Sequence, residues 1–175
     1  MINVIKKYFN ENAVVSIYSD SDDTAVFEVG YINTYNDYEV LLSSINKRGE
    51  YDGYILLRIE DIFHIEANGE YEEKVEKLYS IKNQKHEKLE FANDEIAYQV
   101  LDFAKENNLI VRFEFEDECR CGLVDEIDNN ICTINSINDY GKSDGTAAID
   151  IDKAETIAVD SDIDQDLKLL FESRN

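Results

Sequence analysis

Residues 44–53 read SINKRGEYDG, and residues 136–145 read SINDYGKSDG. Six residues recur in the same order and at the same spacing, 92 positions apart. The repeated asparagines can accept backbone hydrogen bonds within a turn, and the repeated glycines can adopt the positive φ that a compact hairpin loop requires. We therefore interpret the pair as a duplicated turn between the third and fourth strands of two repeats, not as a duplicated binding site. The turn residues are Asn46, Gly49, Asp52, Gly53, Asn138, Gly141, Asp144 and Gly145. This interpretation leaves Ser44 and Ser136 unexplained.

A longer internal repeat surrounds these two stretches. Residues 30–68 align without a gap with residues 122–160, and nine of the 39 columns are identical. Further upstream, residues 15–17 match residues 111–113 only at an offset of 96, which implies that one hairpin is four residues longer than the other. The pattern indicates an internal duplication.

Alternation of apolar and polar residues assigns most of each repeat to strands. Val111, Phe113 and Phe115 alternate with charged residues, as in a half-buried strand. Five short strands joined by tight turns predict a sandwich or a small closed barrel in each repeat. The expected strands lie near 14–19, 24–33, 38–45, 54–60 and 62–67, and then near 109–116, 119–127, 131–137, 146–152 and 154–159.

Helical spacing precedes and follows each set of strands. The apolar residues of the four expected helices are Ile2, Ile5, Tyr8 and Phe9; Tyr71, Val75, Leu78 and Tyr79; Ile96, Val100, Leu101 and Ala104; and Leu167, Leu170 and Phe171. Asn93 is the expected cap of the third helix, with Asp94 and Glu95 in its first turn. The fold class is thus mainly β with flanking helices (α+β): two tandem five-stranded small β-barrels, in residues 1–88 and 89–175. A barrel of about 50 residues is marginal alone, so we expect the two repeats to pack as one compact unit.

Part of this pattern resembles the Sm-like small barrel. The first motif of that family is similar to Gly30, Ile32, Asn36 and Leu42 here, and again to Gly122, Val124, Asp128 and Ile134. The second motif resembles residues 58–65, although the glycine of the family is replaced by Ile59 and its arginine becomes Asp150 in the second copy. The asparagine with which family members hold an RNA base corresponds to Val40 and Cys132, so the RNA-binding positions are not retained. SH3-like barrels have a similar number of strands.

Charge limits the classes of partner. The chain has 17 Lys and Arg against 39 Asp and Glu, a formal net charge of −22, which repels nucleic acid and anionic lipid. The densest basic stretch, residues 77–88, is interpreted as a solvated helix face. We find no secretory or membrane-spanning segment, so we expect a cytoplasmic protein whose partner presents a basic protein surface. The odd cysteine count, in Cys119, Cys121 and Cys132, fits free thiols.

The residue patterns of common catalytic and metal sites are missing from the sequence. His64 and His86 are not at ligand spacing to the three cysteines, with His86 expected on a charged helix. Acidic residues 116–118 beside Cys119 would disfavour a thiolate, so we do not expect a cysteine nucleophile there. Residues 160–166, DSDIDQD, fail the EF-hand pattern at its glycine and final glutamate, so Asp162 or Asp164 is better explained as a helix cap. We predict no enzyme activity, no cofactor and no bound metal.

We therefore predict a non-catalytic binding protein, of the inhibitor, immunity or adaptor type, that docks on a basic partner. The alternatives are an Sm-like RNA-binding protein and a pair of barrels that senses a small molecule. The candidate acidic partner surface consists of Asp20, Asp22, Asp23, Asp160, Asp162, Asp164 and Asp166. The candidate aromatic ligand surface consists of Tyr31, Tyr35 and Tyr38.

Overall fold

The computed structural model describes residues 1–89, 91, 95–116 and 118–174. The chain divides into two compact units, residues 1–94 and 95–175. The boundary thus falls a few residues after the one predicted from the sequence.

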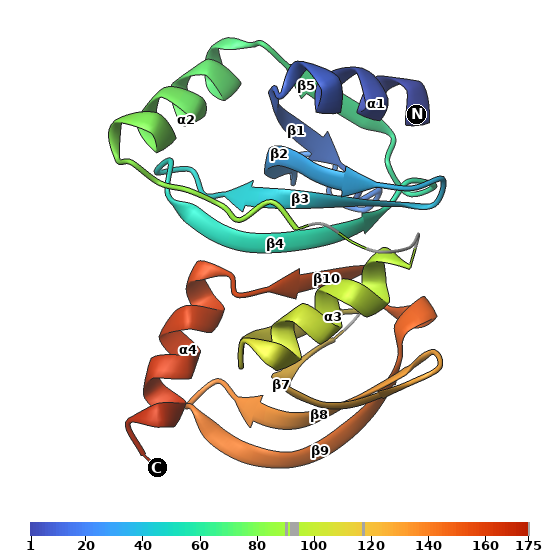
Figure 1. Ribbon diagram of the computed structural model, residues 1–175, viewed down its shortest axis with the longest axis vertical. Coiled ribbons are helices and arrows are strands. Elements are labelled where there is room, and N and C mark those ends of the chain that lie inside the picture. Colours follow the sequence, from blue (N-terminus) through green and yellow to red (C-terminus); the bar gives the residue numbers. More distant parts are fainter. Residues whose placement is uncertain (90, 92–94, 117, 175) are drawn as a thin grey trace. The chain divides into compact units, whose positions relative to one another are not determined.

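The first unit contains two helices and a five-stranded antiparallel sheet (Figure 1). The strand order is β5-β1-β2-β3-β4. In chain order the elements are α1 (Ile2–Glu11), β1 (Val14–Tyr18), β2 (Glu28–Tyr35), β3 (Glu39–Ile45), β4 (Tyr51–Arg58), β5 (His64–Ala67) and α2 (Glu70–Ile81). Ile5 of α1 packs into the main apolar cluster with Val15, Leu42 and Leu57. A second cluster joins Val75 and Tyr79 of α2 to Val14 and Val29.

The second unit repeats this order of elements. They are α3 (Ile96–Glu106), β6 (Ile110–Glu114), β7 (Cys119–Asp128), β8 (Ile131–Asn138), β9 (Lys142–Asp150), the short 3-10 helix η1 (Ile151–Lys153), β10 (Thr156–Val159) and α4 (Asp162–Glu172). Its strand order is β10-β6-β7-β8-β9. The predicted class, mainly β with four flanking helices, is confirmed. Within the described residues no ladder joins β4 to β5 or β9 to β10, so closure of either sheet into a barrel is not shown.

The duplication extends through the helices that precede the strands. Asn12 and Asn108, 96 positions apart, both have positive φ at the end of their helix. The next residue donates back into the last turn in each case: Ala13 N–H to the Tyr8 carbonyl at 3.2 Å, and Leu109 N–H to the Ala104 carbonyl at 2.8 Å. Asparagine tolerates this left-handed conformation better than most side chains, which explains its presence at both ends.

The repeated decapeptides form the same turn in both units. The Oδ1 atom of Asn46 accepts hydrogen bonds from the N–H groups of Arg48 and Glu50 at 2.9 and 3.2 Å. Asn138 accepts in the same way from Tyr140 and Lys142 at 3.1 and 3.2 Å.

The two Asp-Gly pairs lie in a different place from the one predicted. They are part of β4 and β9, not of the turn, and each pair lies at the register shift opposite the repeated serine. Gly53 and Gly145 supply the positive φ of a β-bulge there. Ser44 and Ser136 in turn pair with Gly30 and Gly122, where the strands approach closely: a Cβ on either glycine would lie 3.0–3.1 Å from the serine Cα. This close approach accounts for the two glycines, and the serines stay unexplained.

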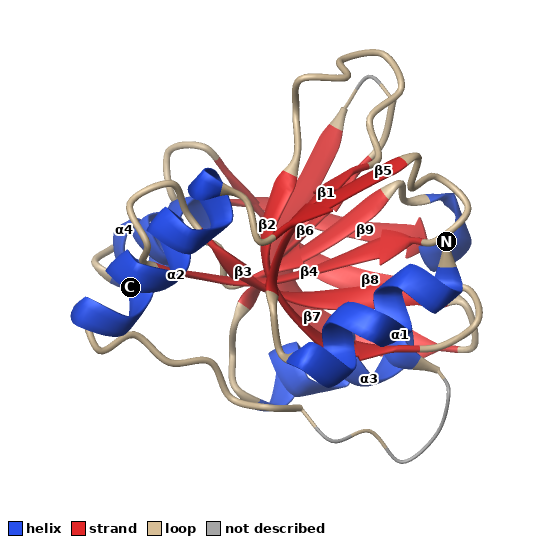
Figure 2. Cartoon of the chain, turned by 90° about the horizontal axis from the view of Figure 1, so that it is seen from above, coloured by secondary structure: helices blue, strands red, loops and turns tan. Residues whose placement is uncertain are grey.

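Three predictions about helices are wrong. Helix α2 ends at Ile81, so residues 82–88 are not a helix face, and Figure 2 shows them as loop. Helix α3 begins at Ile96, which places Glu95 at the cap position rather than in the first turn. Asn93 and Asp94, the predicted cap and its neighbour, lie outside the described residues. The cap of α4 is Ser161, not Asp162 or Asp164.

Candidate functional site

The most distinctive feature of the first unit is the segment of residues 82–89, KNQKHEKL, which we call the strap. Asn83, two residues after the end of α2, has a φ of 53°, and the N–H of Gln84 donates to the Tyr79 carbonyl at 3.1 Å. This reversal turns the chain out of the helix. The strap then runs as an elongated segment from α2 across β3 and β4 (Figure 1).

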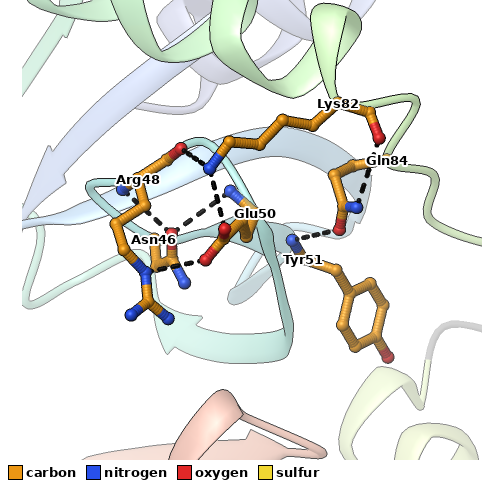
Figure 3. A network of polar contacts seen from close by, with 6 residues as sticks. All are labelled: Asn46, Arg48, Glu50, Tyr51, Lys82 and Gln84. Atoms are coloured by element: carbon orange, nitrogen blue, oxygen red, sulfur yellow. Dashed lines mark hydrogen bonds and ion pairs between the residues drawn. The ribbon is translucent and has the colours of Figure 1, made fainter.

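The first copy of the repeated turn holds the beginning of the strap (Figure 3). Lys82 Nζ donates to the Arg48 carbonyl at 2.8 Å and to the Glu50 carboxylate at 2.7 Å. The hydrogen bond from Lys82, together with the charges of Arg48 and Lys82, lowers the pKa of Glu50 below its ordinary value. Gln84 Oε1 accepts from the Tyr51 N–H at 3.0 Å, which satisfies a backbone donor at the start of β4.

An aromatic clamp holds the middle of the strap. The His86 ring stacks on Tyr51 and on Tyr79, with centroid distances of 4.5 and 5.7 Å, and meets Tyr54 edge-on at 5.5 Å. His86 Nε2 lies 2.9 Å from the Gly53 carbonyl, and Nδ1 lies 2.7 Å from the Tyr79 hydroxyl. A carbonyl can only accept, so Nε2 carries the proton and Nδ1 accepts from Tyr79.

Burial lowers the pKa of His86 to about 4, although the carbonyls of Gly53 and Ser44 act in the opposite direction. The clamp therefore holds a neutral imidazole at pH 7.

Asn33 binds the end of the strap. It occupies the extra position at the β2–β3 register shift, and it is buried. Its Nδ2 donates to Ser43 Oγ at 2.8 Å and to the Glu87 carbonyl at 3.0 Å, while its Oδ1 accepts from the Leu89 N–H at 3.1 Å. The Tyr54 hydroxyl also donates to the Glu87 carbonyl, at 3.0 Å. The Asn33 side-chain amide thus binds the main chain of the strap in two ways, as a donor to Glu87 and as an acceptor from Leu89.

A groove of about 620 Å³ lies beside the strap. The lining comes from the end of α1, from β2 and β3, from Tyr79 and from strap residues 84–88. Of the predicted aromatic surface, only Tyr31 reaches it. Its hydroxyl donates to Glu76 at 3.2 Å, and burial, followed by the charge of Glu76, raises its pKa to about 12. Tyr35 instead packs against Phe9 at 5.3 Å, and Tyr38 is 78% exposed on a hairpin.

The predicted acidic surface divides between the two units. In the first unit, Asp20 accepts from the N–H groups of Asp22 and Asp23, which makes an exposed turn. In the second unit, Asp160, Asp162 and Asp166 are half-buried or exposed around the start of α4. Asp164 is buried, so its carboxylate belongs to the interior rather than to a partner surface.

Asp164 forms a buried ion pair that the sequence did not reveal. Arg112 Nη2 and Nε lie 2.6 and 3.1 Å from Asp164 Oδ1. Burial by itself would lower the pKa of Arg112, but the hydrogen bond and charge of Asp164 outweigh it and raise that pKa. In the first unit the equivalent pair consists of Ser16 and Glu72. The Ser16 hydroxyl donates a hydrogen bond to the buried Glu72 carboxylate.

The three thiols are free: Cys119 is exposed, whereas Cys121 and Cys132 are buried. Burial raises the pKa of Cys121 despite the nearby Arg112, and it raises the pKa of Cys132 to about 12. Neither buried thiol is therefore a thiolate at neutral pH. Among the described residues, no group of three His, Cys, Asp or Glu side chains could hold a metal ion.

Sequence reasoning missed the strap because its lysines continue the charge pattern of α2. Asn83, which is suited to a helix end, was the available signal. No helix in the described part of the chain has the length and apolar character needed to cross a membrane. The chain matches no family model, no curated protein and no solved structure.

Proposed function

We propose that this protein is a non-catalytic interaction module that binds basic, elongated segments of a partner protein. The observation that supports the proposal is the strap. A single segment of the chain, rich in lysine, lies across one of its own sheets and is bound through main-chain and side-chain contacts by β2, β4 and the repeated turn.

The charges of the strap and of the rest of the chain are complementary. The strap carries Lys82, Lys85 and Lys88 against one acidic residue, Glu87, whereas the whole chain has a net charge of −22. An acidic surface of this kind attracts basic partners from solution and accelerates their association. Such a module would act as an inhibitor, an immunity protein or an adaptor.

The likeness to Sm-like or SH3-like barrels, including closure of each sheet into a barrel, belongs to this proposal. It is supported by the five-strand order repeated in both units and by the glycines of the second strand. RNA binding is not favoured, because Val40 and Cys132 are buried apolar side chains where the family places its base-binding asparagine.

A direct test uses labelled peptides and the full chain. The probes are a peptide with the strap sequence KNQKHEKL, its acidic counterpart ENQEHEEL, and U-rich and A-rich oligonucleotides. We expect the basic peptide alone to bind, as measured by fluorescence anisotropy, with an affinity that falls roughly tenfold between 50 and 300 mM NaCl as charges are screened. Equal binding of the two peptides, no binding of the basic one, or tight binding of an oligonucleotide would contradict the proposal.

A further inference from the structure

We propose that the second unit carries an open binding site for a basic chain segment, on the face that corresponds to the strap site of the first unit. This inference rests on the proposed function and identifies where a partner binds. We call the site the β7–β9 face and define it by Asp125, Asn135, Asp144, Gly145 and Thr146.

The two faces have the same backbone construction. Asn33 sits at the register shift between β2 and β3, and Asp125 sits at the corresponding shift between β7 and β8. Each side chain contacts the equivalent residue of the neighbouring strand: Asn33 Nδ2 donates to Ser43 Oγ, and Asn135 Nδ2 donates to Asp125 Oδ1 at 3.4 Å. Gly53 and Gly145 form the bulge of the next strand, with φ of 66° and 79°.

The faces differ in what covers them. In the first unit, three side chains of this face are between 2% and 6% exposed: Asn33, Ser43 and Tyr54. The Glu87 carbonyl of the strap accepts hydrogen bonds from Asn33 and Tyr54. In the second unit, the equivalent Asp125, Asn135 and Thr146 are all exposed. At Gly145, an added Cβ would meet nothing within 4 Å. The exposure of these side chains means that no described segment of the chain covers the positions that correspond to the strap-binding residues of the first unit.

The side chains of the β7–β9 face select for positive charge. The donor and acceptor roles that Asn33 combines are divided here, since Asn135 can donate to a passing main-chain carbonyl while Asp125 only accepts. Asp144 adds a second carboxylate at the bulge, and Lys142 at the start of β9 is the cation on the same strand. The unit as a whole has 20 acidic and 7 basic residues. Because of these carboxylates, we expect the face to bind segments with Lys or Arg side chains more tightly than neutral or acidic ones.

The aromatic clamp is not conserved between the units. Ser143 and Thr146 replace the clamp residues Tyr51 and Tyr54, so an imidazole cannot stack there as His86 does. Binding would then depend on hydrogen bonds and charge. We expect it to be weaker than strap binding in the first unit, where the tether also raises the local concentration of the segment. Reversible capture of a basic segment fits such a site.

The test uses the full chain, whose own strap already covers the first unit, and the labelled KNQKHEKL peptide. The double variant Asp125→Lys/Asp144→Lys reverses the charge of the face. The control Glu106→Lys/Glu172→Lys makes the same change of net charge at exposed positions on α3 and α4. We expect the face variant to bind at least about fivefold more weakly and the control to change affinity by less than about twofold. In the unmodified chain, the peptide should shift the backbone amide signals of Asp125, Asn135 and Gly145.

The outcomes separate this site from the proposed function. The peptide can bind while the two double variants lower its affinity equally, or while the amide shifts fall on other residues. Either result would reject the β7–β9 face as the binding site but leave the proposed binding of basic segments intact. A larger effect of the control would place binding at the acidic residues around α4. If no basic peptide binds the unmodified chain, both proposals fail. Amide spectra of each variant check that it is folded.

Discussion

At the scale of single residues, the packing of α2 and α4 depends on one glycine in each repeated turn. Gly49 has a φ of 70°, and a Cβ there would lie 2.3 Å from the Cβ of Leu78 in α2. Gly141 has a φ of 66°, and its Cβ would lie 2.6 Å from the Cβ of Leu170 in α4. Both helices thus rest directly on the turn backbone. The turn was recognisable from sequence by its residue chemistry, but this reason for the glycine depends on a helix that is distant in the chain.

Alanine at Gly141 should be costly because it combines backbone strain with a clash. We expect Gly141→Ala to lower the free energy of unfolding by roughly 2–4 kcal/mol. Gly145→Ala is the matched control, since its φ is also positive but its Cβ would meet nothing within 4 Å, so about 1 kcal/mol is expected. Urea denaturation followed by circular dichroism measures both. Equal losses would show that helix contact contributes nothing at the turn.

His86 should make stability depend on pH. Its pKa is about 4 in the fold, below the ordinary value near 6.5, so between these values the unfolded chain binds a proton that the folded chain does not. The stabilisation is therefore complete above about pH 6.5 and is lost as the pH falls towards 4, by at most about 3 kcal/mol. We expect the free energy of unfolding to fall more steeply with decreasing pH in the unmodified chain than in His86→Phe. Denaturation measured from pH 7.5 to 4.5 compares the two slopes. Parallel slopes would mean that the imidazole is not held neutral.

At the scale of elements, each C-terminal helix is fixed by a buried carboxylate in its first turn. Glu72 Oε2 accepts from the Gly69 N–H at 3.1 Å, and Asp164 accepts from the hydroxyl of its cap residue Ser161 at 2.6 Å. The same carboxylates face the first strand of each sheet, where they meet Ser16 and Arg112. In each unit one carboxylate therefore bonds to the cap residue of the helix and also ties the helix to the sheet.

Removing the cation from the second pair should be strongly destabilising. Asp164 has no exposed side-chain surface, so Arg112→Met leaves a buried carboxylate without its countercharge, at a cost of roughly 3–5 kcal/mol. Arg120→Met is the control because its ion pair with Glu118 is about half exposed, and less than about 1 kcal/mol is expected. Denaturation midpoints compare the two. Arg112→Met/Asp164→Leu should recover much of the loss, and no recovery would argue against an isolated charge as the cause.

The sequence allowed most of the elements to be predicted, because period-two and helical patterns depend on local burial. All ten predicted strands overlap strands of the structure, including β7 and β8, and the four apolar helix stripes lie on α1 to α4. The strap could not be predicted in this way. Its position depends on Asn33, Tyr51 and Tyr54, which are more than 25 residues away in the chain, and its lysines give no periodic signal that distinguishes an exposed helix from a bound loop.

At the scale of the whole molecule, the internal repeat was accessible from sequence because identical turns require identical residues. The site was accessible only in part. The acidic composition led to the prediction of a basic partner, but the proposed β7–β9 face depends on the contrast between Asn33 and Asp125. That contrast has meaning only once the two residues are known to occupy equivalent bulges. Neither residue stands out in the sequence.

The net charge of −22 should itself oppose folding, because compaction brings like charges closer together. Raising NaCl from about 10 to about 150 mM shortens the screening length from roughly 30 to 8 Å, and we expect the unfolding midpoint to rise by roughly 2–5 °C. A variant with four exposed carboxylates neutralised, at Asp22, Glu106, Glu116 and Asp166, should start from a higher midpoint and respond less to salt. Differential scanning calorimetry measures both series. An identical salt response would assign the effect to specific ion binding, because general repulsion must fall when the charge that causes it is reduced.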